Sequence, residues 1–106
     1  MLEPEISPED LQSLLAEQNI QLLDVREPDE YETCHLDNAT LMPLRTLSQD
    51  MEQLNVNQHI VVYCHHGRRS LMAVKQLREA GFASTQSLKG GIDLWSQTID
   101  ASIPRY

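Results

Sequence analysis

The sequence predicts a single α/β domain, residues 1–106, built around a mainly parallel sheet. Two observations lead to this fold class. Short apolar runs that suit buried strands alternate along the chain with segments whose apolar residues recur at helical spacing. A length of 106 residues supplies one hydrophobic core and is too short for two. In such sheets the reactive site lies beyond the carboxyl ends of the strands, so functional residues are expected there.

The first half of the chain contains three predicted strands and three predicted helices. Ser7 is a suitable N-cap and Pro8 suits the first helical position, so a helix begins there and stops near Asn19. Residues 22–25 form an apolar run typical of a buried strand, and Pro28 starts a second helix. The other predicted elements are a short strand at Ile6, a strand over 39–44 and a helix that begins near Ser48.

The second half repeats the alternation of strand and helix. The apolar run 60–63 predicts a strand that ends at Cys64. A stripe of small and apolar residues from Ser70 onward predicts a helix, which Gly81 terminates. The remaining predictions are a weaker strand over 82–88, a turn at Gly90 and Gly91, and a last short helix from Ile92.

Composition and charge exclude several classes of function. The net charge of −8 argues against a surface for nucleic acid or anionic membrane. No apolar run is long enough to cross a bilayer. Residues 1–5 are acidic and lack the features of a secretory signal, so we expect a cytoplasmic protein. Two cysteines in such a chain indicate reactive or buried thiols in place of a disulfide framework.

The residues that point to chemistry directly follow the strand over 60–63. The candidate nucleophile is Cys64, and a short cationic loop and a helix start follow it: His65, His66, Gly67, Arg68, Arg69 and Ser70. A helix N-terminus and two arginines stabilise a thiolate, and inward-pointing N–H groups of a compact loop bind an anion. The alternative is that Cys64 is an unreactive core cysteine, since free cysteine is often buried.

The two histidines of the loop raise the question of a metal ion. Three consecutive ligands, Cys64, His65 and His66, are poorly arranged for one tetrahedral ion, so we predict no metal centre. The histidines are then walls of the loop or a pH-sensitive partner of a bound anion, or solvated loop residues. The sequence does not choose between these roles.

Three segments taken together resemble the rhodanese family of sulfurtransferases over nearly the whole chain. They are residues 22–31, continued through His35, Ala39 and Pro43; residues 61–70; and residues 88–95, which contain Gly90, Gly91 and Trp95. The resemblance implies a sheet of about five strands flanked by helices on both faces. It also implies a reaction that needs no cofactor.

The activity that the resemblance implies is sulfur transfer through a persulfide on Cys64. A donor such as thiosulfate would supply the sulfur, and cyanide, a thiol or a protein cysteine would accept it. A persulfide carrier with a dedicated protein partner is the alternative. Related phosphatases and arsenate reductases place five residues between cysteine and arginine, whereas four separate Cys64 from Arg69. The shorter loop favours a sulfur atom over a tetrahedral oxyanion.

The resemblance also assigns supporting roles. Asp24 and Arg26 are expected to brace the loop by ion pairing, and the alternative is a strand-end ion pair that fixes the sheet. Trp95 is expected to pack in the core. The family usually has glycine where this chain has Cys34 and Asn38. Asparagine tolerates a left-handed backbone, and Cys34 is interpreted as a spare buried thiol, with a resolving cysteine for Cys64 as the less favoured alternative. The oligomeric state stays open.

Overall fold

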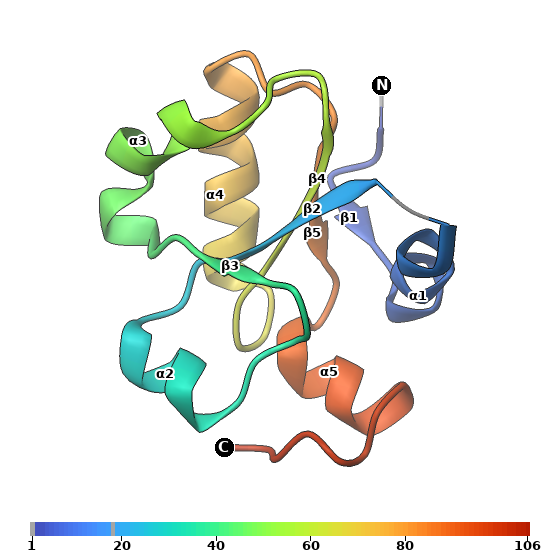
Figure 1. Cartoon of the computed structure of the whole chain (residues 1–106). Coiled ribbons are helices and arrows are strands. Elements are labelled where there is room, and N and C mark those ends of the chain that lie inside the picture. The colour runs from blue at the N-terminus through green and yellow to red at the C-terminus, as the bar shows by residue number, and fades with distance from the viewer. Residues whose placement is uncertain (1, 18) are drawn as a thin grey trace.

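The chain forms one five-stranded sheet, as a computed structural model shows for residues 2–17 and 19–106 (Figure 1). Every pair of neighbouring strands is parallel, and the strand order is β1-β5-β4-β2-β3. The strands are β1 (Glu5–Ile6), β2 (Ile20–Asp24), β3 (Thr40–Leu41), β4 (His59–Tyr63) and β5 (Thr85–Leu88). The predicted α/β class with a parallel sheet of about five strands is confirmed.

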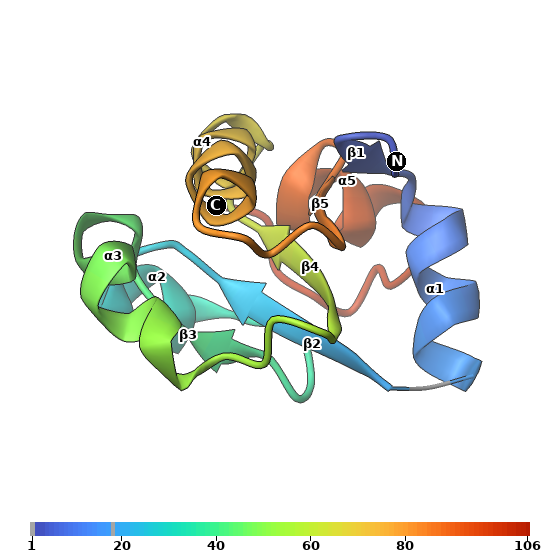
Figure 2. The same cartoon turned by 90° about the horizontal axis from the view of Figure 1, so that it is seen from above.

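The helices divide between the two faces of the sheet. They are α1 (Pro8–Glu17), α2 (Pro28–Thr33), α3 (Leu47–Asp50), α4 (Arg68–Glu79) and α5 (Gly91–Thr98), with the 3-10 turns η1 (Leu44–Thr46) and η2 (Met51–Gln53) flanking α3. α3 and α4 lie on one face, and α1 and α5 lie on the other (Figures 1 and 2). Within the described residues, no helix is long and apolar enough to cross a membrane.

Alternate residues of the central strands point into two hydrophobic clusters, one on each face of the sheet. Leu23 and Val62 belong to the cluster that contains the buried side chains of α4. Leu22 and Val61 belong to the other cluster, together with Trp95 of α5, which is buried as predicted. Burial on both faces explains why these strands read as continuous apolar runs in the sequence.

Two predicted strands are shorter than expected. The strand predicted over 39–44 spans only Thr40–Leu41, and the chain turns into η1 after Pro43. The N–H groups of Met42 and Leu44 still donate to the carbonyls of Asp24 and Val25. The strand predicted over 82–88 begins only at Thr85. The N–H of Phe82 instead donates to the carbonyl of Leu77, which closes the end of α4.

Helix lengths and turns follow the predictions with smaller differences. The helix predicted near Ser48 is the four-residue α3. The helix predicted from Ser70 begins two residues earlier, at Arg68, and ends before Gly81, whose φ is +102°. Asn38 has a φ of +66°, the left-handed backbone that the sequence predicted for it.

The start of α5 packs directly against the backbone that follows β4. The N–H of Ile92 donates to the carbonyl of Cys64 at 2.9 Å, and the N–H of Asp93 donates to the carbonyl of His65 at 3.1 Å. These two donors belong to the first turn of α5, where no carbonyl of the helix itself is available. Gly91 makes the close approach possible, because a Cβ there would lie 2.4 Å from the carbonyl oxygen of His65.

We predict that Gly91→Ala destabilises the fold more than Gly81→Ala does. Both glycines have a positive φ, at +62° and +102°, so an alanine costs about 1–2 kcal/mol at either position. At Gly91 the Cβ also meets loop backbone, which adds about 1–3 kcal/mol, whereas open space surrounds Gly81. Urea unfolding of the two variants measures the difference. Equal losses of stability would show that α5 does not press on the loop.

Candidate active site

Cys64 lies at the carboxyl end of β4, which is the middle strand of the sheet. The loop that follows it turns at Gly67, and α4 begins at the next residue. Cys64 is a free cysteine and only 1% exposed. Strand, cysteine, short loop and helix start are therefore arranged as the sequence predicted.

The loop surrounds the sulfur atom of Cys64 with hydrogen-bond donors. The backbone N–H groups of Gly67 and Ser70 point at the sulfur, with N···Sγ distances of 3.1 Å and 3.4 Å. Gly67 has a φ of +109°, a backbone conformation that a residue with a Cβ resists, and this conformation turns the loop into α4. Two N–H groups of the loop and the first turn of α4 thus stabilise negative charge on the sulfur.

Two buried hydroxyl groups complete the surroundings of the sulfur. The hydroxyl of Ser70 lies 3.4 Å from the sulfur of Cys64 and 2.7 Å from the hydroxyl of Ser87 on β5. Ser70 also donates to the carbonyl of Gly67, at 3.1 Å. Ser87 was not among the predicted site residues. Its signal in the sequence was a serine within a predicted strand that is buried, where an apolar residue is the usual choice.

The two arginines of the loop have different surroundings. Arg69 forms a bidentate ion pair with Glu30 of α2, with distances of 2.7 Å and 2.9 Å. Arg68 is exposed, and no ion pair with it is found in the described part of the chain. The hydrogen bonds and charge of Glu30, and then the charge of Cys64, raise the pKa of Arg69 against the effect of burial, so Arg69 interacts with both groups. The hydrogen bonds from Arg69 lower the pKa of Glu30 to about 2, against the effect of burial.

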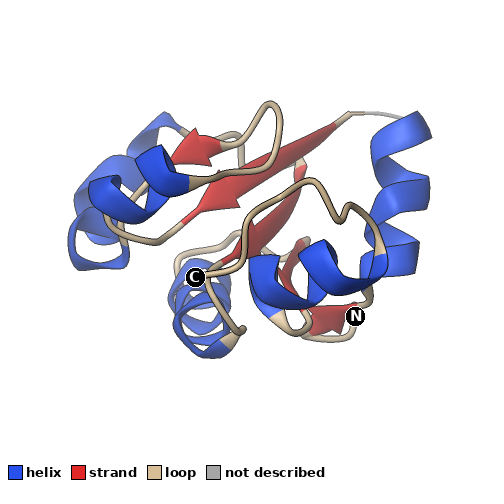
Figure 3. Cartoon of the chain, turned by 90° about the horizontal axis from the view of Figure 1, so that it is seen from below, coloured by secondary structure: helices blue, strands red, loops and turns tan. Residues whose placement is uncertain are grey.

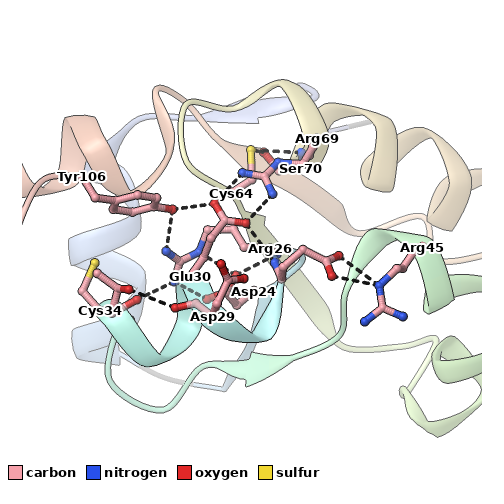
Figure 4. A network of polar contacts seen from close by, with 12 residues as sticks. Asp24, Arg26, Asp29, Glu30, Cys34, Arg45, Cys64, Arg69, Ser70 and Tyr106 are labelled. Carbon is pink, nitrogen blue, oxygen red and sulfur yellow. Dashed lines mark hydrogen bonds and ion pairs between the residues drawn. The ribbon is translucent and has the colours of Figure 1, made fainter.

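Glu30 connects the loop to a buried ion pair below it (Figure 4). Tyr106 donates its hydroxyl hydrogen to Glu30 and accepts a hydrogen bond from Arg26, both at 2.8 Å. Arg26 in turn binds Asp24 at the end of β2 through two side-chain hydrogen bonds of 2.9 Å and 2.6 Å. Asp24 and Arg26 form an ion pair with each other at the end of β2, which is the strand-end pair that the sequence offered as the alternative. It reaches the loop through Tyr106 and Glu30, and not by direct contact.

Both members of the buried ion pair are completely shielded from solvent. The side chains of Asp24 and Arg26 are each 0% exposed. Burial alone would lower the pKa of Arg26, but the hydrogen bonds and charge of Asp24, with the hydrogen bond to Tyr106, raise it above its ordinary value. Arg26 also donates to the carbonyl of Cys34 at 2.6 Å. The guanidinium therefore fixes three separate segments of the chain at one point.

His65 and His66 form one wall of the loop. Their rings stack at 3.8 Å, and the other partner of His65 is Tyr106, stacked at 3.9 Å between ring centroids. Burial, followed by the neighbouring His66, lowers the pKa of His65. Figure 3 shows how the segment after α5 runs back along the molecule toward residue 106. The contacts of Tyr106 explain that course, and the sequence alone gave no sign of them.

The two histidines and Asp93 bring three potential metal ligands within 4.8 Å of one another. The sequence considered Cys64 as the third ligand, whereas the structure places Asp93 there. Asp93 already pairs with Arg105, at 2.9 Å, and accepts a hydrogen bond from Gln97. Stacked imidazole rings also do not direct two lone pairs at one ion. His66 lies 3.8 Å from the carboxylate of Asp93, which is already bound to Arg105.

Cys34 lies apart from the site. Its side chain belongs to the cluster of α1 and α5, whereas Cys64 belongs to the cluster of α4, and both cysteines are free. The Cys34 thiol donates to the carbonyl of Pro104 at 3.4 Å. These contacts fit the interpretation of a buried spare thiol. A cavity of about 460 Å³ lies nearby, between α1, α5 and the loop before β3, and no residue of the 64–70 loop lines it.

The chemistry available at this site follows from its geometry. A buried sulfur atom faces two backbone N–H groups, and the donors would also face a second sulfur atom or an oxyanion attached to it. The loop is held by α5 on one side and by Glu30 on the other. The arrangement is that of a nucleophilic cysteine with a fixed, partly positive environment.

Comparison with known proteins gives consistent results. Residues 7–98 match the model of the family described as rhodanese-like domain. YrkF of Bacillus subtilis, a proposed sulfur carrier protein, is 35% identical over 94 residues, which are 88% of this chain and 51% of YrkF. The thiosulfate sulfurtransferase GlpE of Coxiella burnetii is 33% identical over 95 residues, which are 90% of this chain and 89% of GlpE. The chain thus spans about half of YrkF and most of GlpE.

A solved structure gives the same result for the fold. The crystal structure of a rhodanese-like domain protein from Staphylococcus aureus has a TM-score of 0.84 and 26% identity, over 98% of this chain and 99% of that one. The family match includes the strand before Cys64, the loop and the start of α5. This chain belongs to the rhodanese-like domain family.

Proposed function

We propose that the protein is a sulfurtransferase that moves a sulfane sulfur atom through a persulfide on Cys64. The observation that carries the proposal is the pair of loop N–H groups, from Gly67 and Ser70, directed at the sulfur. The name of GlpE, a thiosulfate sulfurtransferase, supports thiosulfate as a donor. Neither step requires a cofactor.

In the first step the Cys64 thiolate attacks the outer sulfur of thiosulfate. The bond between the two sulfur atoms of thiosulfate breaks, sulfite leaves with the bonding electrons, and Cys64 carries a persulfide anion. The outer sulfur then bears the negative charge. The N–H groups of the loop would stabilise this charge, because they are fixed in place before the reaction and need not reorganise.

In the second step a thiophilic acceptor attacks the outer sulfur of the persulfide. The acceptor takes the outer sulfur, so that cyanide becomes thiocyanate or a thiolate becomes a new persulfide. The bond between the two sulfur atoms breaks, and its electrons return to the sulfur of Cys64. The thiolate of Cys64 is then ready for another donor. The backbone N–H of Ser70, 3.4 Å from the sulfur, would donate to the leaving thiolate during this step.

Phosphatase activity is the less well supported function for the same loop. Four residues separate Cys64 from Arg69, and the Arg69 guanidinium is already bound to Glu30 by two hydrogen bonds. A tetrahedral phosphate would need that guanidinium for its own oxygens. Hydrolysis of a generic aryl phosphate by the purified protein would overturn this preference.

A persulfide carrier is the second candidate, and one observation favours it. Glu30 balances the charge of Arg69, and Cys64 is only 1% exposed. A small dianion such as thiosulfate is therefore attracted to this loop less strongly than to a loop with two unpaired arginines. The name of YrkF, a proposed sulfur carrier protein, fits this candidate. A carrier would load one sulfur atom per molecule from thiosulfate yet show little steady-state turnover of thiosulfate with cyanide.

We predict that incubation with thiosulfate adds one sulfur atom to the protein, at Cys64 only. Intact-mass measurement should show the gain in the wild type and in Cys34→Ser, and no gain in Cys64→Ser. Cys34 is the matched control, since it is the other cysteine of the chain and its thiol is also buried. A gain in Cys64→Ser equal to that of the wild type would refute a Cys64 persulfide.

We predict that Glu30→Gln costs less stability at acid pH than at neutral pH. The pKa of Glu30 is lowered from 4.5 to about 2 in the folded protein, so the carboxylate stabilises the fold above about pH 4.5. This contribution is lost as the pH falls through about 2, where the folded protein also protonates Glu30. Urea unfolding of the variant and the wild type, from neutral pH down to about pH 3, measures the difference.

Glu32→Gln is the matched control for this experiment. Glu32 lies on the same helix, and no ion pair or side-chain hydrogen bond with it is found in the described part of the chain. Its replacement should leave the unfolding free energy nearly unchanged at neutral pH. A gap between wild type and Glu30→Gln that stays constant across the pH range would show that the ion pair with Arg69 contributes nothing.

A further inference from the structure

The Lys and Arg side chains that form no ion pair with a carboxylate are concentrated on α4. Four of the eight Lys and Arg residues form ion pairs with carboxylates: Arg26, Arg45, Arg69 and Arg105. Three of the other four are on α4, and no carboxylate within ion-pair distance is found for them among residues 2–17 and 19–106: Arg68, Lys75 and Arg78. α4 carries a single acid, Glu79, in its last turn. It is therefore a positive element in a chain of net charge −8.

One face of α4 combines these cations with exposed apolar side chains. Arg68, Leu71, Met72 and Lys75 are spaced i, i+3, i+4 and i+7, so they share one side of the helix. All four are exposed, and Met72 is the most exposed large apolar side chain of the described chain, at 58%. We name these four residues the basic–apolar face. Figure 2 shows α4 nearly end-on, at the surface of the molecule.

The buried side of α4 explains why this face is not needed for folding. Ser70, Ala73, Val74 and Leu77 are its buried residues, and the last three lie in the hydrophobic cluster. Single exposed apolar residues are common on proteins. Two neighbouring ones between unpaired cations, at the start of the helix that borders Cys64, form a surface with a definite chemical character.

We propose that the basic–apolar face is the docking surface for a protein that accepts sulfur from Cys64. This inference rests on the sulfurtransferase function proposed above. The partner has an acidic surface with an apolar centre, and it presents a cysteine beside the docked area. The negative charge of the partner is complementary to Arg68 and Lys75. The rest of this chain, whose net charge is −8, repels an acidic partner that approaches in other orientations. Met72 offers an adaptable side chain for the apolar contact.

The position of the face suits the transfer of sulfur. Arg68 follows directly after Gly67, whose N–H points at the sulfur of Cys64. A partner seated on the first two turns of α4 is therefore adjacent to the loop. Its cysteine thiolate attacks the outer sulfur of the Cys64 persulfide, the bond between the two sulfur atoms breaks, and the electrons return to the Cys64 thiolate. The partner leaves as a persulfide, and no oxidant or reductant is consumed.

The test compares cysteine peptides of opposite charge as sulfur acceptors. The first peptide places Glu and Leu residues around one cysteine, the second has Lys in place of each Glu, and 2-mercaptoethanol serves as a neutral small acceptor. The persulfidated protein should react about tenfold faster with the acidic peptide than with the basic one at low salt. High salt should remove most of this preference.

The variant Met72→Ser/Lys75→Glu should lose the preference while keeping its reaction with thiosulfate and 2-mercaptoethanol. Neither residue contacts the sulfur, and both side chains are exposed, so the variant should unfold at the wild-type temperature. Lys89→Glu is the matched control, because Lys89 is exposed, has no ion pair in the described chain and lies outside α4. It changes the net charge as much as Lys75→Glu does and should keep the preference.

A second measurement separates this inference from the function on which it rests. Fluorescence anisotropy of the same peptides with serine in place of cysteine reports docking to the unloaded protein, without any sulfur chemistry. The acidic peptide should bind the wild type more tightly than the double variant. Equal rates and equal binding for both peptides, or for wild type and double variant, would overturn the docking surface. Self-association of the wild type that the double variant lacks would overturn it too, in favour of a second copy.

Discussion

The structure depends on keeping a short loop closed around a buried sulfur atom. The N–H groups of Gly67 and Ser70 point at that atom, and contacts from other segments of the chain hold the loop in this conformation. α5 holds the carbonyls of Cys64 and His65 from one direction, through N–H groups of its first turn. The N-terminus of α4 lies at the sulfur of Cys64, and the N-terminus of α5 binds the backbone carbonyls of Cys64 and His65.

The loop is also supported by a series of ion pairs and hydrogen bonds that runs from the sheet to Arg69. It begins with the buried pair of Asp24 and Arg26, passes through Tyr106 and Glu30, and ends at Arg69. Burying such a pair costs desolvation, so its value lies in the geometry that it fixes more than in stability. Every member has an opposite charge or a hydrogen-bond partner next to it, which satisfies the condition for buried polar networks.

Local residue patterns allowed most of the fold and the position of Cys64 to be predicted, and long-range contacts did not follow from them. Apolar runs and helix caps predicted the strands and helices, and Cys64 followed from its place between a strand and a helix start. Ser87 contacts Ser70 from 17 residues away along the chain, and Tyr106 contacts Arg26 from 80 residues away. A local sequence pattern carries no information about such contacts. The partner of Arg69 was missed for the same reason, since Glu30 is 39 residues away.

The dispersal of the site along the chain has a consequence for biosynthesis. A ribosome that has released residues up to Ser70 has released the nucleophile and its loop, but not Ser87, Gly91 or Tyr106. β1 also cannot join the sheet before β5 has been synthesised, since Glu5 pairs with Ser87. The Cys64 thiol therefore gains its full environment only after residues 85–106 have been synthesised and have folded back toward the loop, which is later than the synthesis of the loop itself.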